Sequence, residues 1–119
     1  MSYASFRKTH PLNECPLNAA LEVFGGRWKV KVISWLAEYP HHYGALCDHL
    51  PDISRKVLTQ QLRELIADGI VAREVTGEVP APVIYSLTEY GCSLLPALES
   101  IRQWGKRHVQ LTSAHDAYR

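Results

Sequence analysis

Apolar side chains recur every three or four residues through the first half of the chain, which is the spacing of one face of an α-helix. This spacing predicts helices over 16–24, 28–39 and 43–50. The helices are closed by glycine or proline at Gly25, Pro40 and Pro51. We expect their apolar faces to hold Leu17, Ala20, Leu21, Phe24, Trp28, Val32, Ile33, Leu36, Tyr43, Leu46 and Leu50.

A fourth helix is predicted over 54–68, because Ser54 is a good N-cap residue and Gly69 a good C-terminal stop. One side of this helix is apolar and consists of Val57, Leu58, Leu62, Leu65 and Ile66. The opposite side, at i, i+3, i+4 and i+7, consists of Lys56, Thr59, Gln60 and Arg63. That polar side is basic and rich in hydrogen-bond donors. Whether it is only solvated or contacts a ligand is the main functional question that the sequence raises.

After Gly69 the hydrophobic period changes from 3.6 to 2. Segments 70–75 and 83–87 alternate as strands and are joined by the proline-rich loop 76–82, which predicts a β-hairpin. Thr88 can cap a last helix that Pro96 should kink or divide, since proline lacks a backbone N–H and clashes with the preceding turn. We expect residues 112–119 to form a flexible tail beyond that helix.

The 119 residues suit a single domain, with an N-terminal arm over 1–12 and the folded part over 13–111. The predicted class is mainly α with a small β-hairpin, that is, α+β. A short helix, a tight turn, a longer helix with a polar outer side and then a hairpin is the order of a winged helix-turn-helix. In that fold the second helix of the pair enters the DNA major groove.

The polar side of helix 54–68 has the chemistry that reading double-stranded DNA requires. Arginine can bond guanine through two donors, and glutamine can pair with adenine in the same two-point manner. The expected base-reading residues are Arg55, Lys56, Thr59, Gln60 and Arg63. The expected phosphate-contacting residues are Arg27, Lys29, His42, Tyr43, Ser54 and Arg73.

Two other interpretations of this polar side stay open. A Lys/Gln/Arg side of a helix is often simply solvated, and winged helices also serve as protein-binding modules that do not bind DNA. The formal net charge of +1 neither demands nor excludes nucleic acid, because a local patch matters more than the total.

Composition and residue spacing exclude several other classes of protein. The N-terminal segment lacks the apolar core of a secretory signal, and no apolar run approaches the ~18 residues of a membrane span, so we expect a cytoplasmic protein without membrane contact. Three widely spaced cysteines, Cys15, Cys47 and Cys92, do not form a disulfide framework. The histidines do not cluster as zinc ligands, and Cys15 has no base beside it. We therefore expect no metal, no cofactor and no enzymatic activity.

The chain from about Asn13 to Trp104 resembles the HxlR family of bacterial winged-helix transcriptional regulators, which is akin to the MarR-type regulators. The resemblance lies in motifs that follow one another at family spacing. They are "CP" before the first helix, "GGRW", "ISRKVLTQQLREL" followed by "DGIV", "YSLTEYG" and "LLP". It implies a transcriptional regulator, most simply a repressor, that binds DNA as a homodimer.

The same resemblance implies that the N- and C-terminal helices form the dimer interface. The expected interface residues are Leu17, Phe24, Leu94, Leu98, Ile101 and Trp104. Phe24, Leu98, Ile101 and Trp104 also add more apolar surface than a domain of this size is expected to hide alone. A two-fold dimer should bind a palindromic operator whose half-sites lie about 10 bp apart.

Members of this family often sense electrophiles or oxidants through a cysteine just before the first helix, and Cys15 occupies that position. A thiol beside a helix N-terminus lies at the positive end of the helix dipole, which favours the reactive thiolate. Two alternatives remain: Cys15 is an inert, buried residue, or Phe24, Trp28, Trp35 and Trp104 line a pocket for a small aromatic effector.

The wing departs from the family pattern. Pro82 stands where relatives commonly carry arginine or lysine, Ile84 stands in place of a usual glutamate, and the loop contains Glu78 but no base. A wing without a cation should hold the minor groove weakly. We therefore expect the affinity for DNA to depend mainly on helix 54–68 and on phosphate contacts.

Overall fold

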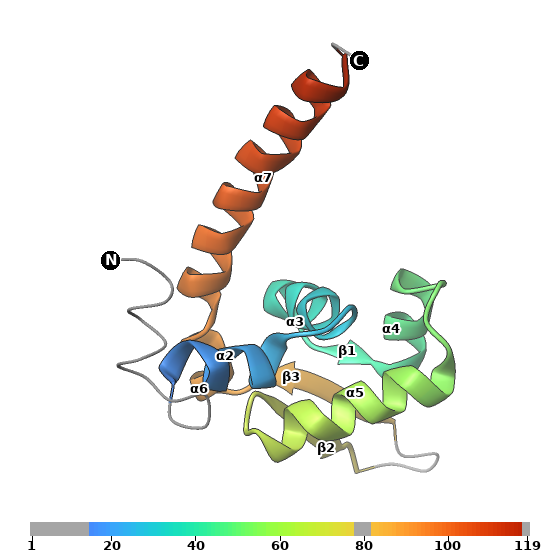
Figure 1. Cartoon of the computed structure of the whole chain (residues 1–119). Coiled ribbons are helices and arrows are strands. Elements are labelled where there is room, and N and C mark those ends of the chain that lie inside the picture. The colour runs from blue at the N-terminus through green and yellow to red at the C-terminus, as the bar shows by residue number, and fades with distance from the viewer. Residues whose placement is uncertain (1–14, 78–81, 118–119) are drawn as a thin grey trace.

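The computed structural model describes residues 15–77 and 82–117. The expected arm over 1–12, the residues around Glu78 at the wing tip, and 118–119 lie outside the described residues. In chain order the elements are α2 (Pro16–Phe24), α3 (Lys29–Glu38), β1 (His41–His42), α4 (Tyr43–His49), α5 (Arg55–Ala67), β2 (Val71–Val75), β3 (Val83–Leu87), α6 (Glu89–Cys92) and α7 (Leu95–Ala117) (Figure 1). The predicted class, mainly helical with a small β-sheet wing, is confirmed.

Local sequence signals place most helix ends. Pro16 begins α2, where its missing N–H costs nothing, and Gly25 follows its last residue. The Ser54 hydroxyl accepts a hydrogen bond of 3.1 Å from the backbone N–H of Val57 and so caps α5. Gly69 follows α5 with a φ of 76°, a left-handed conformation that glycine adopts without steric cost. The predicted start and end of the α5 helix are therefore confirmed.

The sheet has one strand more than the predicted hairpin. Its order is β1-β3-β2, and both pairings are antiparallel. The hairpin pairs Val71 with Leu87 and Val75 with Val83, as the alternating pattern indicates. The additional strand, β1, pairs His41 with Tyr85 on the other edge of β3. This pairing ties the wing to the segment between α3 and α4.

The core lies where α3, α4 and α5 meet the sheet. Its most deeply buried side chains are Val32, Ile33, Leu46, Leu58, Leu62 and Leu65. The predicted inward residues of α3, α4 and α5 are thus mostly confirmed, with Val57 the exception. Val57 is 36% exposed, because it lies about 100° around the helix from Leu58, at the margin of the apolar side.

Pro96 divides the C-terminal helix, as expected. Thr88 caps the short helix α6 by accepting a hydrogen bond from the Gly91 N–H at 2.8 Å. A turn at Ser93 and Leu94 separates the two helices, and α7 begins at Leu95, so that Pro96 occupies its first turn.

Helix α7 is longer than the sequence predicted. The segment 112–117, which we expected in a tail, continues the helix to Ala117, so the predicted boundary at 111 is wrong. In Figure 1 α7 projects away from the other elements, while α5 lies along the opposite, lower edge of the domain. The outer part of α7 is therefore well separated from α5.

Candidate nucleic-acid interface

The outer side of α5 is open to solvent. Arg55, Lys56, Gln60 and Arg63 are exposed, and Thr59 is half-buried. These residues, together with Val57 and Gln61, line a surface hollow of about 550 Å³ along the helix. The opposite side packs Leu58, Leu62 and Leu65 into the core. The helix is therefore held rigidly by its apolar side while it presents cations and an amide outward.

Tyr43, at the start of α4, holds the first turn of α5. Its hydroxyl donates to the backbone carbonyl of Arg55 at 3.1 Å and also lies 3.1 Å from the hydroxyl of Thr59. The Arg55 guanidinium lies 5.9 Å from the centre of the Tyr43 ring, a cation–π distance. Because the Tyr43 proton is used inside the protein, it is not free to donate to a DNA phosphate, and that part of our expectation is not supported.

Lys29 also departs from its expected role. Its side chain is buried, and its Nζ lies 3.1 Å from a carboxylate oxygen of Glu64 on α5. Gln60 donates to the other oxygen of Glu64 at 3.4 Å. The hydrogen bond from Lys29, more than that from Gln60, holds the pKa of Glu64 below its ordinary value. Lys29 therefore connects α3 to α5 and is not presented as a phosphate contact.

The other expected phosphate contacts lie on separate elements. Arg27 is exposed in the turn before α3, and its guanidinium lies 4.9 Å from the Trp28 ring. His42 is exposed on β1 and Arg73 on β2. Ser54 is exposed as the cap of α5, with its hydroxyl oxygen accepting from Val57. Their accessibility leaves the predicted phosphate role open.

The described part of the wing is closed just below its tip. The backbone N–H and the hydroxyl of Thr76 both donate to the Pro82 carbonyl, at 3.0 and 3.1 Å. Pro82 is exposed, whereas Ile84 is half-buried and paired with Glu74 and His42 across the sheet. The substitution of Ile84 for an acid thus affects the sheet rather than the tip.

The three cysteines differ in accessibility. Cys15 occupies the N-cap position of α2 and is only 6% exposed. Cys47 on α4 is half-buried against the core, and Cys92 at the end of α6 is exposed. Among the described residues no group of three or more His, Cys, Asp or Glu is arranged to hold a metal ion.

The expected dimer residues differ in exposure and fall into three groups. Leu17, Ile101 and Trp104 are 54%, 50% and 58% exposed. Leu94 and Leu98 are half-buried against the core. Phe24 is buried within the chain, so our expectation that it adds apolar surface to an interface is wrong. Beyond Trp104, α7 also exposes Val109 and Leu111, which sequence analysis did not single out.

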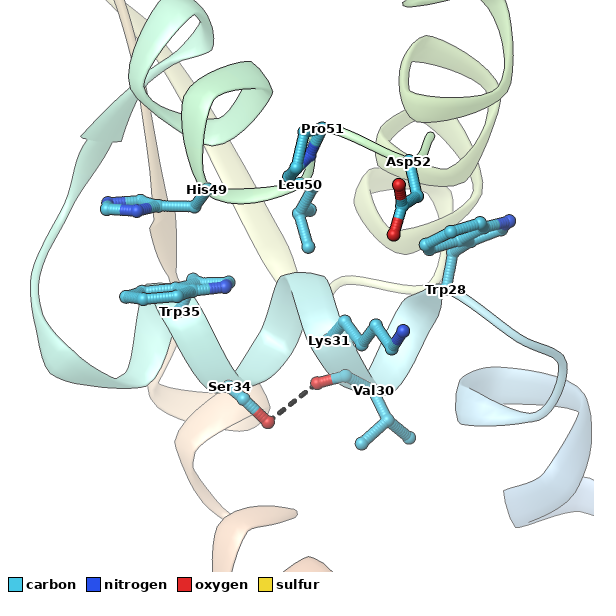
Figure 2. A pocket seen from close by; sticks show the side chains of 9 residues that line it. All are labelled: Trp28, Val30, Lys31, Ser34, Trp35, His49, Leu50, Pro51 and Asp52. Carbon is cyan, nitrogen blue, oxygen red and sulfur yellow. Dashed lines mark hydrogen bonds between the residues drawn. The ribbon is translucent and has the colours of Figure 1, made fainter. Parts of the chain in front are cut away.

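A second cavity, of about 290 Å³, lies between α3 and the turn that joins α4 to α5 (Figure 2). At one end the ring of His49 stacks on Trp35 at 3.8 Å, and at the other lies Trp28. The ammonium of Lys31 lies 4.8 Å from the Trp28 ring, and Asp52 lies above that ring. Trp35 and Trp28 are two of the aromatic residues expected to line an effector pocket. Phe24 and Trp104 do not line this cavity.

Within the described part of the chain, no helix is both long and apolar enough to span a bilayer. The β2–β3 hairpin forms the wing, and α4 and α5 form a helix pair joined by a tight turn, with an exposed basic side on α5. These features define a winged helix-turn-helix protein of the DNA-binding class.

Comparison with known proteins gives the family. The chain matches the model described as "HxlR-like helix-turn-helix" over residues 23–113, and it belongs to that family of transcriptional regulators. It is 43% identical to the HTH-type transcriptional regulator YtcD of Bacillus subtilis (strain 168), over 78% of this chain and 74% of that protein.

Two solved structures resemble it closely. The redox regulator HypR in its reduced form superposes with a TM-score of 0.79 at 37% identity, over 83% of this chain and 98% of that one. The reduced transcriptional regulator YodB of B. subtilis gives a TM-score of 0.72 at 34% identity, over 78% and 92% of the two chains. YodB has also been solved in a quinone-bound form, and HypR in an oxidised form.

Proposed function

We propose that this protein is a sequence-specific repressor that binds a palindromic operator as a homodimer, with α5 in the major groove. The observation that carries the proposal is the outer side of α5, where Lys56, Gln60 and Arg63 are all exposed. The proposed activity is binding and not catalysis. It would take place in the cytoplasm, where a bacterial operator lies.

The side chains on α5 suit different parts of the DNA. Arg63 can bond both acceptors on the edge of guanine, and Gln60 can pair with the donor and acceptor on adenine. Lys56 and Arg55 lie in the first turn and supply positive charge for bases or phosphates. Beside the wing tip the chain carries Pro82 instead of a cation, and the exposed Arg73 lies further back on β2, where we expect it to contact phosphate. We therefore expect the major groove to dominate the affinity.

The homodimer is supported by α7. Its exposed apolar residues, Ile101, Trp104 and Leu111, lie on a helix that projects from the domain (Figure 1). Burying such residues against a second copy would remove them from water, which is the main favourable term in association. A two-fold pair of this kind would present its two α5 helices to half-sites about 10 bp apart.

The direct test is selection of bound duplexes from a random pool, followed by affinity measurements at several salt concentrations. The logarithm of the affinity should fall linearly with the logarithm of salt concentration. At fixed salt, Arg63→Ala or Gln60→Ala should weaken specific binding by about 1–3 kcal/mol and relax the preference at one base pair.

Lys106→Ala is the matched control, because Lys106 is an exposed cation on α7. It should leave operator affinity unchanged. Unchanged affinity in both α5 variants would contradict the assignment of the recognition helix. Absence of any DNA retardation at low salt would favour the protein-binding alternative instead.

Cys15 is the proposed sensor of electrophiles or oxidants. The support is its position at the N-cap of α2, together with similarity to the redox regulator HypR and to YodB, which has a quinone-bound form. Since Cys15 is 6% exposed, reaction with a quinone requires α2 to open locally. Such an opening would disturb the N-terminal part of the proposed dimer.

A quinone should therefore release the wild-type protein from its operator and spare Cys15→Ser. Cys92→Ser removes an exposed thiol and should behave as the wild type. Equal release of the wild type and Cys15→Ser would remove Cys15 from the mechanism.

The cavity in Figure 2 supports a second candidate function, binding of a small aromatic effector. Trp28 offers an aromatic ring at one end, the stacked pair of Trp35 and His49 lies at the other, and Lys31 offers a cation for a carboxylate. Salicylate is a suitable probe, because it is planar and anionic. Salicylate should change the tryptophan fluorescence with a saturable dependence on concentration, and Lys31→Ala should weaken its binding. A fluorescence change that does not saturate would show that salicylate does not bind in this cavity.

A further inference from the structure

The contacts of Tyr43 determine which hydrogen-bonding group Thr59 can offer to DNA. Tyr43 has a single hydroxyl proton, and the Arg55 carbonyl, 3.1 Å away, can only accept. The proton of Tyr43 is therefore committed to Arg55. The second contact joins the Tyr43 and Thr59 hydroxyl oxygens at 3.1 Å, and we assign Thr59 as its donor because the Tyr43 proton is already used.

This assignment leaves Thr59 with an acceptor only. Its one hydroxyl proton points to Tyr43, so what remains for a ligand is oxygen lone pairs and a methyl group. Thr59 lines the hollow on the outer side of α5, between the residues proposed to read bases. The oxygen lone pairs are therefore the hydrogen-bonding groups that Thr59 can offer to a ligand in that hollow.

An acceptor in the major groove is selective. Adenine N6 and cytosine N4 carry amino donors there, whereas guanine O6 and N7, thymine O4 and the phosphate oxygens are all acceptors. A threonine free to rotate could serve either kind of partner. A threonine whose proton is held by Tyr43 can bond the amino bases only.

We propose that Thr59 reads an amino group of adenine or cytosine, and that Tyr43 is the positioning residue that makes Thr59 an obligate acceptor. This inference rests on the proposed function, since it requires α5 to lie in the major groove. It assigns Tyr43, expected from the sequence to contact phosphate, an internal role in specificity.

The experiment uses the full chain and the operator selected by the wild type. At each operator position, adenine is replaced by purine nucleoside, or cytosine by 2-pyrimidinone, which deletes the amino group alone. Each altered duplex is measured with the wild type and with Thr59→Val, which lacks the hydroxyl but keeps a similar shape. The comparison separates the contact from the weakened base pair, because both proteins meet the same duplex.

At one position in each half-site, deletion of the amino group should weaken wild-type binding about 2- to 10-fold more than it weakens binding of Thr59→Val. Thr59→Ser keeps the hydroxyl and should retain the wild-type response. Equal losses in the wild type and Thr59→Val at every position would overturn the proposal, as would selective reading of guanine or thymine that Thr59→Val abolishes.

Tyr43→Phe tests the positioning role directly. It frees the proton of Thr59, so discrimination against guanine or thymine at that position should shrink about 2- to 10-fold. Urea unfolding of each variant confirms that it is folded before DNA is added. Discrimination equal to that of the wild type would overturn the role of Tyr43.

The measurements distinguish failure of the proposed function from failure of the inference about Thr59. If no duplex is enriched from the pool and none is retarded at low salt, both the proposed DNA binding and the role of Thr59 are wrong. If an operator is selected and Arg63→Ala weakens its binding while Thr59→Val responds to the analogues as the wild type does, the function stands and only this inference fails.

Discussion

Helices α5 and α7 differ in how their apolar residues are covered. In α5, Leu58, Leu62 and Leu65 are at most 2% exposed, and the solvent-facing side is predominantly polar. In α7, Ile101, Trp104 and Leu111 are at least half exposed. The chain therefore completes the packing of α5 by itself, whereas the outer part of α7 stays uncovered in the single chain. We propose that a second copy covers it.

The difference separates two kinds of function. A helix that is fixed on one side can present its other side in a defined geometry, as base recognition requires. A helix with uncovered apolar residues suits association, where the energy comes from removing those residues from water. Changes in α5 should act on folding and DNA binding, and changes in outer α7 should act on self-association.

The largest expected effect comes from the buried side of α5. Leu62→Ala leaves a cavity among Leu58, Leu65 and their neighbours and should lower the free energy of unfolding by about 2–5 kcal/mol. Urea denaturation followed by circular dichroism measures the loss. Leu111→Ala removes the same atoms from a side chain that is 71% exposed, and in dilute monomer it should change stability little. Comparable losses of unfolding free energy in the two variants would contradict the difference in burial between α5 and α7.

The next effect concerns the exposed side of α7. Trp104 is 58% exposed, and its ring stacks on His108 of the next turn at 5.1 Å between ring centres. If it anchors the dimer, Trp104→Ala should weaken self-association about 10- to 30-fold in sedimentation equilibrium. Val75 on the wing is similarly exposed, at 53%, and Val75→Ala serves as the control. A Trp104→Ala protein that dimerises as well as the wild type would place the interface elsewhere.

A smaller effect is expected at the start of α5. Ser54→Ala removes the hydroxyl that accepts from Val57 and should cost about 1 kcal/mol of unfolding free energy. Ser34 is a matched control, because its hydroxyl donates to the Val30 carbonyl within α3 and caps no helix end. Chemical denaturation of Ser34→Ala should agree with the wild type within about 0.5 kcal/mol. Equal losses from the two serines would rule out a capping role for Ser54.

The sequence predicted these elements where local chemistry determines them. The capping roles of Ser54 and Thr88, the left-handed turn at Gly69 and the place of Pro96 each involve the residue's own backbone or the adjacent turn, so they followed from residue type and spacing. The bonds from the Thr88 hydroxyl to Gly69 and Ile70 join distant segments and were not predicted. Periodicity likewise identified the buried side of α5 and the two strands of the hairpin.

The features that the sequence did not predict depend on partners distant in the chain. Strand β1 is two residues long and exists because His41 and His42 pair with the free edge of β3. Lys29 resembled a phosphate contact because its partner, Glu64, is brought to it only by the packing of α3 against α5. The hydroxyl of Tyr43 also finds Thr59 through the tertiary fold. Periodicity does not reveal such pairs.

The smallest effect is expected from the ion pair that joins α3 to α5. The folded state lowers the pKa of Glu64 from its ordinary value of 4.5, chiefly through the hydrogen bond from Lys29. The stabilisation should be fully present above pH 4.5 and should be lost as the pH falls through the folded-state pKa. Glu64→Gln should therefore flatten the dependence of unfolding free energy on pH below 4.5, measured by urea titration at successive pH values.

Lys29→Met offers the complementary variant, because it removes the partner and leaves the carboxylate in place. It should flatten the same pH range, and the double variant should add little to either single change, since both remove one interaction. Glu99 on α7, whose pKa is lowered to about 2 by the hydrogen bonds from Arg102 and Gln103, should act over the same fall in pH from 4.5 to about 2. The effect of Glu64 is therefore measured as the difference between the wild type and Glu64→Gln, since both keep Glu99. An unchanged pH dependence in Glu64→Gln would show that the contact between Lys29 and Glu64 contributes nothing to holding α5 against α3.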